Sequence, residues 1–452
     1  MAAVIQFVPE VPSQAAAFGA VELSEDVMAQ RFETEFSGRV LYAHNRKQWF
    51  LYDEARGAWR PDQTDLVLHY VRTFVRGLNA RNEARWGKAA VVAAVERLAR
   101  AHPGIAVSGA EFDADPWLLG TPSGVYDLRT CERLPPSKDH MVTLSTTVAP
   151  DLEAPPPLWL HFLQDATGGN AELCDYLQRL AGYALTGDTR EESLVFAHGS
   201  GGNGKGVFLG TIAAILGDYC KVAAMDAFLE TKSDRHPTDL ADLAGARLVV
   251  ASESSEGRRW DEQRVKALTG RDAISARFMR GDFFSFIPQF KLIVASNHKP
   301  RIRSGDDAWR RRLQLAPFER KPDTPDPTLK DRLKEEYPAI LGWMMQGTEW
   351  WLREGLAPPA VVTEATAAYF DEEDLFGIWF REHGIEDKAA VTERKPLYQS
   401  YEAWCREMGH RAATAYALTR WLKVCGFGQD MSKASRPILG ARLRTDSDGG
   451  LF

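Results

Sequence analysis

The chain has 452 residues, of which 44% are hydrophobic, and its net charge at pH 7 is −7. This length and composition predict a folded protein of two to four domains rather than a disordered chain. The five cysteines lie far apart and form no C-x-x-C pair, so neither a disulfide framework nor a zinc site is expected, and a reducing cytoplasm fits. No basic and apolar leader and no apolar run of membrane-spanning length is found, so secretion and membrane insertion are not expected.

Residues 1–25 are rich in Ala and Pro and are expected to be a loosely ordered lead-in. Residues 26–150 predict a small mixed α/β domain. Helical spacing of its apolar residues predicts helices at 66–85 and 88–101.

Residues 40–62 alternate aromatic and polar residues around a D-E-A-R-G turn. This pattern predicts a hairpin. Trp49, Tyr52 and Trp59 are expected to form one packed face, and a stacking platform for bases is the alternative.

Three consecutive prolines, residues 155–157, indicate a domain boundary. Apolar residues at helical spacing follow from 158 to 185. Residues 155–190 therefore predict a helical collar, a natural place for subunits to meet.

Residues 194–210, LVFAHGSGGNGKGVFLG, predict a buried strand, a glycine turn and the start of a helix. The spacing from Gly199 to Gly204 and Lys205 is that of a P-loop, in which backbone N–H groups bind phosphate oxygens and the lysine reaches the terminal phosphates. Gly206 stands where this motif has a Ser or Thr whose hydroxyl binds magnesium. An ordinary glycine-rich turn is the alternative. The predicted nucleotide-binding residues are Gly199, Ser200, Gly201, Gly202, Asn203, Gly204, Lys205, Gly206 and Val207.

Strands and helices alternate after this turn, as in a parallel sheet with crossover helices. A strand predicted at 246–251 leads into Ser252 and Glu253, and a carboxylate there suits metal binding and polarisation of an attacking water. A strand predicted at 291–296 ends before Asn297, whose amide can sense a γ-phosphate or orient water. The alternatives are a polar loop and a capping Asn.

Positive charge is concentrated in residues 258–312, which contain fourteen Lys/Arg and six Asp/Glu. Such a local excess is typical of a surface that binds nucleic acid. Within it, residues 274–286 predict a hairpin with a basic tip at Arg280. Arg310 and Arg311 belong to a run of three arginines, which is either a solvated face or a group that reaches a neighbouring subunit's γ-phosphate.

Residues 321–385 predict a helical extension and residues 386–452 a small winged-helix-like domain. Residues 391–452 contain ten Lys/Arg and six Asp/Glu, which suits duplex or junction DNA. A helical cap that binds nothing is the alternative. The predicted elements are helices at 395–408 and 415–425 and strand-like pieces at 437–444.

Six segments occur in one order along the chain: DPWLLGTPSGVYDL, GSGGNGKGVF, LVVASESSEG, VKALTGRDAISARFMRGDFFSF, FKLIVASNHKP and WRRRL. Together they resemble the superfamily III helicases of the AAA+ class, in the branch found as the C-terminal part of phage and plasmid primase-helicases and related to the poxvirus primase-helicase. The likeness covers residues 39–444. It implies an α/β fold with an AAA+ P-loop core and parallel sheet at 191–320. It also implies a ring, usually a hexamer, that hydrolyses ATP between subunits and draws single-stranded DNA through its centre.

The resemblance also assigns roles to single residues. Lys205 would contact the phosphates, Glu253 would be the Walker B carboxylate and the magnesium ligand, and Asn297 would be the first sensor. Arg310 or Arg311 would be the arginine finger. Gly206 and Ser252 depart from the family pattern, so magnesium would rest on Glu253, waters and the nucleotide. The predicted DNA-binding residues are Lys266, Arg277, Arg280 and Lys299.

The expected function is that of an ATP-dependent replicative DNA helicase of phage, plasmid or prophage type, in the cytoplasm of a bacterial host. It would use ATP and Mg²⁺ and act on single-stranded and forked DNA as a homo-oligomeric ring. Because roughly forty residues before the resemblance cannot fold a primase domain, a separate primase is an expected partner. One rival is an ATP-binding, DNA-bound ring that serves as a loader or scaffold for a partner primase with little hydrolysis. A P-loop kinase of a small molecule is a second rival, disfavoured by the basic segments.

Overall fold

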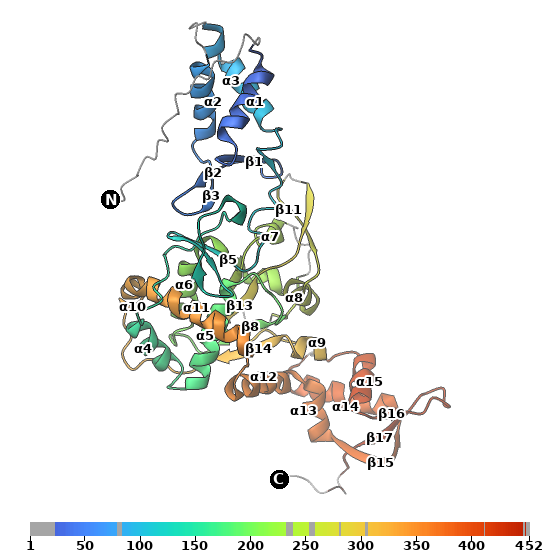
Figure 1. Ribbon diagram of the computed structural model, residues 1–452. Coiled ribbons are helices and arrows are strands. Elements are labelled where there is room, and N and C mark those ends of the chain that lie inside the picture. The colour runs from blue at the N-terminus through green and yellow to red at the C-terminus, as the bar shows by residue number, and fades with distance from the viewer. Residues whose placement is uncertain are drawn as a thin grey trace.

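The computed structural model describes residues 23–78, 84–231, 238–252, 258–279, 282–302, 306–410, 412–445 and 448. The molecule is elongated, with the N-terminal helices at one end, a parallel sheet in the middle and the C-terminal helices and strands at the other end (Figure 1). In the N-terminal part, three helices cover one face of a four-stranded sheet of order β3-β2-β1-β4. These elements are α1 (Glu25–Phe36), β1 (Val40–Ala43), β2 (Gln48–Asp53), β3 (Ala58–Pro61), α2 (Leu66–Gly77), α3 (Ala89–Ala99) and β4 (Ala106–Val107). The helix predicted at 66–85 thus ends earlier, at Gly77, and α3 confirms the second predicted helix.

The antiparallel strands β1 to β3 confirm the predicted hairpin, but the single aromatic face predicted for it is wrong. Trp49 faces the helices, where its indole Nε1 donates to Glu96 Oε1 at 2.6 Å. Tyr52 pairs with Trp59 across the strands, and both pack with Phe112 on the opposite face. Successive strand residues point to opposite faces, so residues 49 and 52 cannot share one.

A three-stranded antiparallel sheet joins the N-terminal part to the central domain, and a buried arginine fastens it there. Arg247 donates to the carbonyl oxygens of Leu118 at 2.6 Å and Leu185 at 2.7 Å, and its guanidinium lies 4.4 Å from the ring centre of Tyr219. A buried cation is tolerated only with such partners, so these contacts require the small sheet to stay docked. Its strands are β5 (Leu118–Thr121), β6 (Gly124–Asp127) and β7 (Glu132–Arg133).

The segment predicted as helical collar forms α4 (Pro157–Ala166) and α5 (Ala171–Leu185). The carboxylate of Glu336 caps α4 by accepting from the N–H groups of Leu158 and Trp159, each at 2.9 Å. Helix α5 packs on α11 (Tyr337–Glu354). A Cβ at Gly182 or Gly347 would overlap the backbone of the opposite helix, so these two glycines permit the close approach.

The central sheet has five parallel strands in the order β14-β8-β13-β10-β9. Its three central strands were all predicted from apolar runs, whereas the edge strands β9 and β14 were not. The chain leaves β8 for the far edge at β9 and returns through β10 and β13 to the side of β8. In open α/β sheets, ligands bind outside the carboxyl ends of strands at such a switch point. The strands are β8 (Leu194–His198), β9 (Cys220–Ala224), β10 (Leu248–Ser252), β13 (Lys291–Ser296) and β14 (Leu313–Pro317), and the helices of this domain are α6 (Lys205–Leu216), α7 (Thr238–Ala241), α8 (Glu262–Thr269) and α9 (Asp307–Arg310).

A separate two-stranded antiparallel hairpin lies between β10 and β13 in the chain. It consists of β11 (Ile274–Arg277) and β12 (Phe283–Phe286), with Arg277 opposite Phe283, which confirms the predicted hairpin. Arg280 lies outside the described residues. Near the tip, Phe278 and Phe283 are 50% and 62% exposed, so this hairpin presents apolar side chains to solvent.

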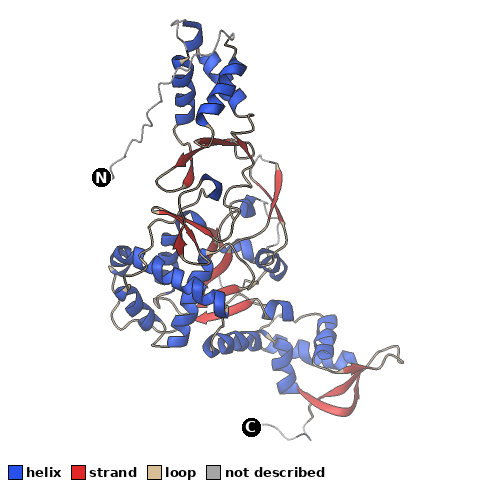
Figure 2. Ribbon diagram, viewed as in Figure 1, coloured by secondary structure: helices blue, strands red, loops and turns tan. Residues whose placement is uncertain are grey.

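The C-terminal end combines helices with a three-stranded sheet of order β15-β17-β16 (Figure 2). Helices α14 and α15 confirm the two predicted helices to within about a residue at each end. Strand β15 was not predicted, because its apolar and polar residues do not alternate regularly. None of the described helices combines the length and the apolarity needed to cross a membrane. The elements are α10 (Leu329–Leu333), α12 (Ala360–Glu373), α13 (Leu375–His383), β15 (Gly384–Thr392), α14 (Arg394–Glu407), α15 (Ala415–Val424), β16 (Gly428–Gln429) and β17 (Ile438–Leu443).

Candidate functional site

The glycine turn lies between the carboxyl end of β8 and the first residue of α6. Gly201, Gly202 and Gly204 have φ angles of 89°, 66° and 87°, in the left-handed region that favours glycine. At Gly199 a Cβ would collide with the carbonyl oxygen of Phe318. Because the first N–H groups of a helix lack intrahelical acceptors, the turn and the start of α6 form a site suited to an anion.

The side chain of Lys205 folds back over this turn. Its Nζ donates to Gly199 O and Asn203 Oδ1, each at 2.8 Å, and to Asn297 Oδ1 at 3.2 Å. The residue is only 6% exposed, and this burial lowers the pKa of the Lys205 ammonium. All three acceptors are neutral, so a phosphate would supply the negative charge that the buried ammonium lacks.

Asn297 follows β13, and its contact with Lys205 joins two of the predicted site residues. The neighbouring strand β8 ends at His198. Burial and the nearby ammonium groups of Lys299 and Lys205 lower the pKa of His198. The switch point therefore combines a positive field with neutral polar groups, which favours an anionic ligand.

A cavity of about 980 Å³ opens beside the glycine turn. Helix α4 contributes five lining residues at positions i, i+3, i+4, i+7 and i+8, which form one face of the helix. Leu158 and Phe162 are apolar, and His161 and Asp165 are polar. The glycine turn is thus at one side of the cavity, and a mixed apolar and polar wall is at the other. The full lining is Leu158, His161, Phe162, Asp165, Ala166, Gly201, Gly202, Asn203, Gly204, Lys205, Gly206, Val207, Ala295, Ser296, Asn297, His298, Arg320, Pro322, Thr324, Pro325, Asp326, Leu329, Lys330 and Arg332.

Two ion pairs lie in the cavity wall opposite the glycine turn. Arg320 pairs with Asp165 of α4 at 2.8 Å, and Arg332 pairs with Asp326 at 3.0 Å. Sequence reasoning missed these residues and the α4 face. The helical spacing within 158–165 was the available signal, but it does not say which surface the helix faces.

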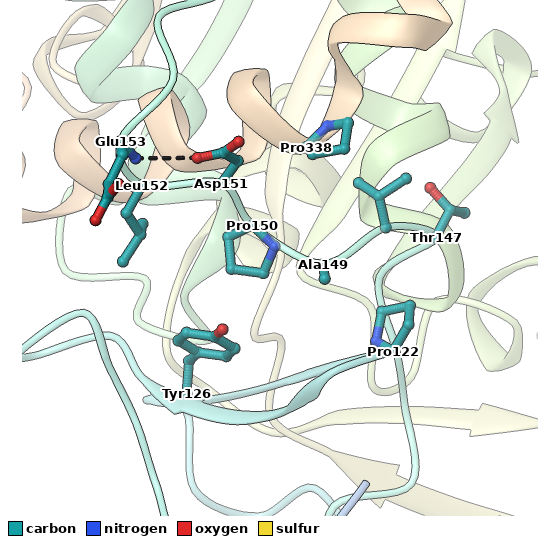
Figure 3. A pocket seen from close by; sticks show the side chains of 10 residues that line it. Pro122, Tyr126, Thr147, Ala149, Pro150, Asp151, Leu152, Glu153 and Pro338 are labelled. Carbon is teal, nitrogen blue, oxygen red and sulfur yellow. Dashed lines mark hydrogen bonds between the residues drawn. The ribbon is translucent and has the colours of Figure 1, made fainter.

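A second, shallower cavity of about 670 Å³ lies elsewhere on the central domain (Figure 3). Its lining includes Tyr126 and several prolines, and its charged members are Asp151 and Glu153. Asp151 accepts a hydrogen bond from the backbone N–H of Glu153 at 3.1 Å. With acidic groups and no cation among its lining residues, this cavity does not suit a phosphate.

The predicted acid Glu253 lies outside the described residues, directly after the last residue of β10. Ser252, which ends that strand, pairs with Ala295 of β13. Within the described residues, no three His, Cys, Asp or Glu side chains are grouped to hold a metal ion. Magnesium coordination by Glu253 remains a prediction.

The candidate arginines are at the end of α9 and do not line the cavity of their own chain. Arg310 is exposed, and its guanidinium carbon lies 4.4 Å from the ring centre of Phe370 on α12. Arg311 is also exposed, and its Nε donates to Asp307 O at 3.3 Å. Helix α9 and the cavity-lining helices α4 and α10 lie on opposite sides of the central sheet (Figure 1).

Three of the four predicted DNA-binding residues are among the described residues, and each of the three has a partner within the chain. Lys266 binds both carboxylate oxygens of Asp306 at 2.7 Å, and Lys299 pairs with Glu372 at 2.9 Å. Arg277 lies on the hairpin, 4.8 Å from the ring centre of Phe283, whereas Arg280 is not among the described residues. Lys266 and Lys299 thus have structural partners inside the chain, and the hairpin remains the candidate DNA surface.

Comparison with known families identifies two regions of the chain. Residues 29–168 match the family described as "D5 N terminal like", and residues 197–312 match a "Family of unknown function (DUF5906)". The chain carries these two domains of the D5-type primase-helicases. This confirms the resemblance seen in the sequence motifs. The second match includes the glycine turn, Asn297 and both candidate arginines.

Two viral relatives of this D5-type chain are distant. It is 24% identical over 319 residues to a candidate helicase of Acanthamoeba polyphaga mimivirus, covering 65% of this chain and 33% of the relative. It is 28% identical over 255 residues to a candidate helicase of Frog virus 3 (isolate Goorha), covering 51% of this chain and 26% of the relative. The chain therefore spans about a quarter to a third of the length of these relatives.

Solved structures of the NrS-1 C-terminal region have a similar fold. One apo structure aligns with a TM-score of 0.51 at 11% identity, and another with a TM-score of 0.50 at 12% identity. Each alignment covers 94% of this chain and 100% of the other. At this identity the likeness extends to the fold alone, an α/β protein with a five-stranded parallel sheet and an N-terminal mixed α/β domain.

In this D5-type chain, Gly206→Ser is expected to raise the rate of ATP turnover by about tenfold, equivalent to about 1.4 kcal/mol in the barrier. The added hydroxyl would supply the magnesium ligand that the P-loop motif has at this position. A Cβ at Gly206 meets no atom within 4 Å, so the serine fits. The measurement is steady-state phosphate release over a magnesium series.

The matched control is Gly210→Ser, one helical turn later on α6 and equally open. Both substitutions raise helix propensity by a similar amount, so a rise confined to position 206 reports on the metal. A lower rate for Gly206→Ser than for Gly210→Ser would mean that the turn has adapted to glycine.

Proposed function

We propose that this chain is an ATP-dependent DNA helicase of the D5 type, built on an AAA+ P-loop core and acting in replication in a phage, plasmid or prophage context. The observation that carries the proposal is the buried Lys205 ammonium, held by Asn203 and Asn297 over a glycine turn at the switch point of a parallel sheet. Ammonium and backbone N–H groups in this arrangement suit the β- and γ-phosphates of a nucleotide. The D5-type domains and the two viral relatives support the same class of activity.

The proposal includes a ring of identical chains, most simply a hexamer, and the placement of the arginines supports it. Arg310 and Arg311 are exposed and do not line the cavity of their own chain. An arginine that completes a neighbour's site is a recurrent way to stabilise charge on the transferred phosphoryl group. ATP hydrolysis would then require contact between subunits.

Single-stranded DNA would be bound by the β11–β12 hairpin, which carries Arg277 and exposed phenylalanines. Forked or duplex DNA would engage residues 386–452, and the two helices α14 and α15 beside the β15-β17-β16 sheet support a winged-helix-like module there. The exposed residues of α15 include Tyr416, Arg420 and Lys423 at helical spacing. Both surfaces present cations, as phosphate binding requires.

The deciding experiment measures ATP hydrolysis with and without single-stranded DNA, together with strand separation on a forked duplex. We expect DNA to stimulate hydrolysis and the fork to be unwound. ATP and DNA binding without turnover would favour the second candidate, a loader or scaffold for a partner primase. The observation that favours this second function is Gly206, which lacks the magnesium-binding hydroxyl.

Arg280→Ala is expected to preserve basal ATP hydrolysis and assembly but to lose most of the stimulation by single-stranded DNA and the unwinding of a fork. The reason is that no described residue of the hairpin lines the cavity beside the glycine turn, and that the hairpin would contact DNA phosphates, whatever the base sequence. Binding should therefore weaken with salt in the parent more steeply than in the variant. The measurement is a salt series on one forked substrate.

Arg271→Ala is the matched control, because Arg271 is an exposed arginine just before β11. Deletion of residues 391–452 should spare unwinding of a pre-threaded strand and impair engagement of the fork. An Arg280→Ala protein that unwinds like the parent would exclude the hairpin from translocation.

A further inference from the structure

Helix α12 contacts both the segment that follows Asn297 and the helix that carries the candidate arginines. It runs beside the edge strand β14, between the central sheet and the C-terminal end of the molecule (Figure 1). Thr366 accepts the otherwise unpaired N–H of Leu315 on that edge at 2.9 Å. The edge strand is thereby covered, and α12 is fixed against the sheet.

Three consecutive contacts fasten α12 to the residues after the sensor. The hydroxyl of Tyr369 donates to the carbonyl oxygen of Pro300, Glu372 pairs with Lys299 at 2.9 Å, and Glu373 accepts from the N–H of Ile302 at 3.1 Å. Tyr369 is 1% exposed, and its hydroxyl also accepts from Trp260 Nε1 at 3.2 Å. Residues 299–302 are therefore held rigidly, two residues beyond the Asn297 amide that contacts Lys205.

The residue next to Tyr369 holds the arginine. Phe370 is 3% exposed, and its ring centre lies 4.4 Å from the guanidinium carbon of Arg310. This is within the distance at which a cation is attracted to an aromatic face. Among the described residues, no aromatic ring packs against the guanidinium of Arg311, whose Nε donates to Asp307 O. Of the two candidate arginines, Arg310 is the one whose position depends on α12.

We propose that Phe370, together with Tyr369 and Glu372, positions Arg310 relative to Asn297. Nucleotide bound in one subunit would then determine the position of the arginine that this subunit contributes to the site of its neighbour. The inference rests on the proposed ring ATPase and adds the physical link between the two sites. The link is short, because Tyr369 contacts the segment after Asn297 and the adjacent residue Phe370 contacts Arg310. Helix α13 follows α12 directly, and Asp374 caps it by accepting from the Gly377 N–H at 3.0 Å, so the C-terminal domain is attached to the same element.

The test compares Phe370→Leu, which removes the aromatic face, with Phe370→Tyr, which keeps it. Phe370→Leu is expected to lower kcat about tenfold with less than about a twofold change in ATP affinity, because only the arginine supplied to the neighbour is misplaced. Phe370→Tyr should retain most of the parent rate. Asp371→Asn, at the exposed neighbouring position, is the control and should leave both quantities unchanged.

Mixing two variants distinguishes a misplaced arginine from a damaged Phe370→Leu subunit. In rings that combine Phe370→Leu with Lys205→Ala chains, some Phe370→Leu subunits receive an arginine from an intact α12, so turnover should rise above that of either variant alone. A misfolded or locally damaged Phe370→Leu subunit would gain nothing. Glu372 is 59% exposed, so Glu372→Gln provides a second variant that does not threaten the core, and it should lower the Hill coefficient for ATP.

Unchanged kcat in Phe370→Leu, or a lowered kcat that mixing does not restore, would overturn the inference. Retained turnover in both Arg310→Ala and Arg311→Ala would instead overturn the ring ATPase on which it rests. The two failures are therefore distinguishable.

Discussion

Lys205→Ala is expected to reduce ATP hydrolysis by about 100- to 1000-fold, the range seen when one preorganised donor is removed from a site of developing charge. The ammonium contacts both Gly199 of the turn and Asn297. Its loss also leaves the buried Gly199 and Asn203 acceptors without a donor, which should cost about 1–3 kcal/mol of unfolding free energy. Phosphate release and thermal unfolding, both without DNA, measure the two effects.

Glu253→Gln is the companion variant, because it removes the charge expected to act on the attacking water and keeps the shape of the side chain. It should bind ATP with near-parent affinity while turnover stops. Lys221→Ala, on the exposed edge strand β9, is the control for loss of a lysine. Persistent hydrolysis in both Lys205→Ala and Glu253→Gln would mean that the site is elsewhere.

Arg310→Ala or Arg311→Ala is expected to lower turnover by about 1000-fold or more while ATP binding stays nearly intact, since an arginine finger acts on the neighbour's nucleotide. Both residues are exposed, and neither lines its own cavity. The third arginine of the run differs from them. Arg312 pairs with Glu192 at 2.6 Å and is part of the fold, so Arg312→Ala should lower stability rather than act in trans. The measurement is kcat together with ATP affinity for all three variants.

Mixing the sensitive arginine variant with Lys205→Ala protein should restore part of the activity, because a mixed ring contains some intact interfaces. A ring made of either variant alone contains no intact interface. Full activity in dilute protein shown to be monomeric would contradict the ring. The prediction is independent of which arginine is the finger.

Much of the central domain could be read from local patterns. The apolar runs before Gly199, Ser252 and Asn297 predicted the three central strands, because strands covered on both faces need continuous apolar residues. The alternating residues around Arg280 predicted the hairpin for a different reason, because a strand with one exposed face alternates apolar and polar residues. The edge strands β9 and β14 and strand β15 were not predicted, because strands at the rim of a sheet show a weaker pattern of apolar residues.

The glycine spacing and Lys205 are properties of contiguous sequence, and so is the strand–turn–helix that holds them. A left-handed backbone can be inferred from glycine alone because other residues rarely adopt it. These features, with the order of the six motifs, were sufficient to indicate the primase-helicase family and to predict which turn binds nucleotide.

The partners of these residues depend on contacts between segments that are far apart in the chain, and spacing does not encode them. Asn297 reaches Lys205 only because β13 pairs beside β8, and the wall of α4 faces the turn only because Glu336 and α11 hold that helix in place. Tertiary packing likewise paired Lys266 and Lys299 with acids and set Phe370 against Arg310. Each of these side chains takes the partner that the packed fold brings within reach, and this partner is visible only once the chain is folded.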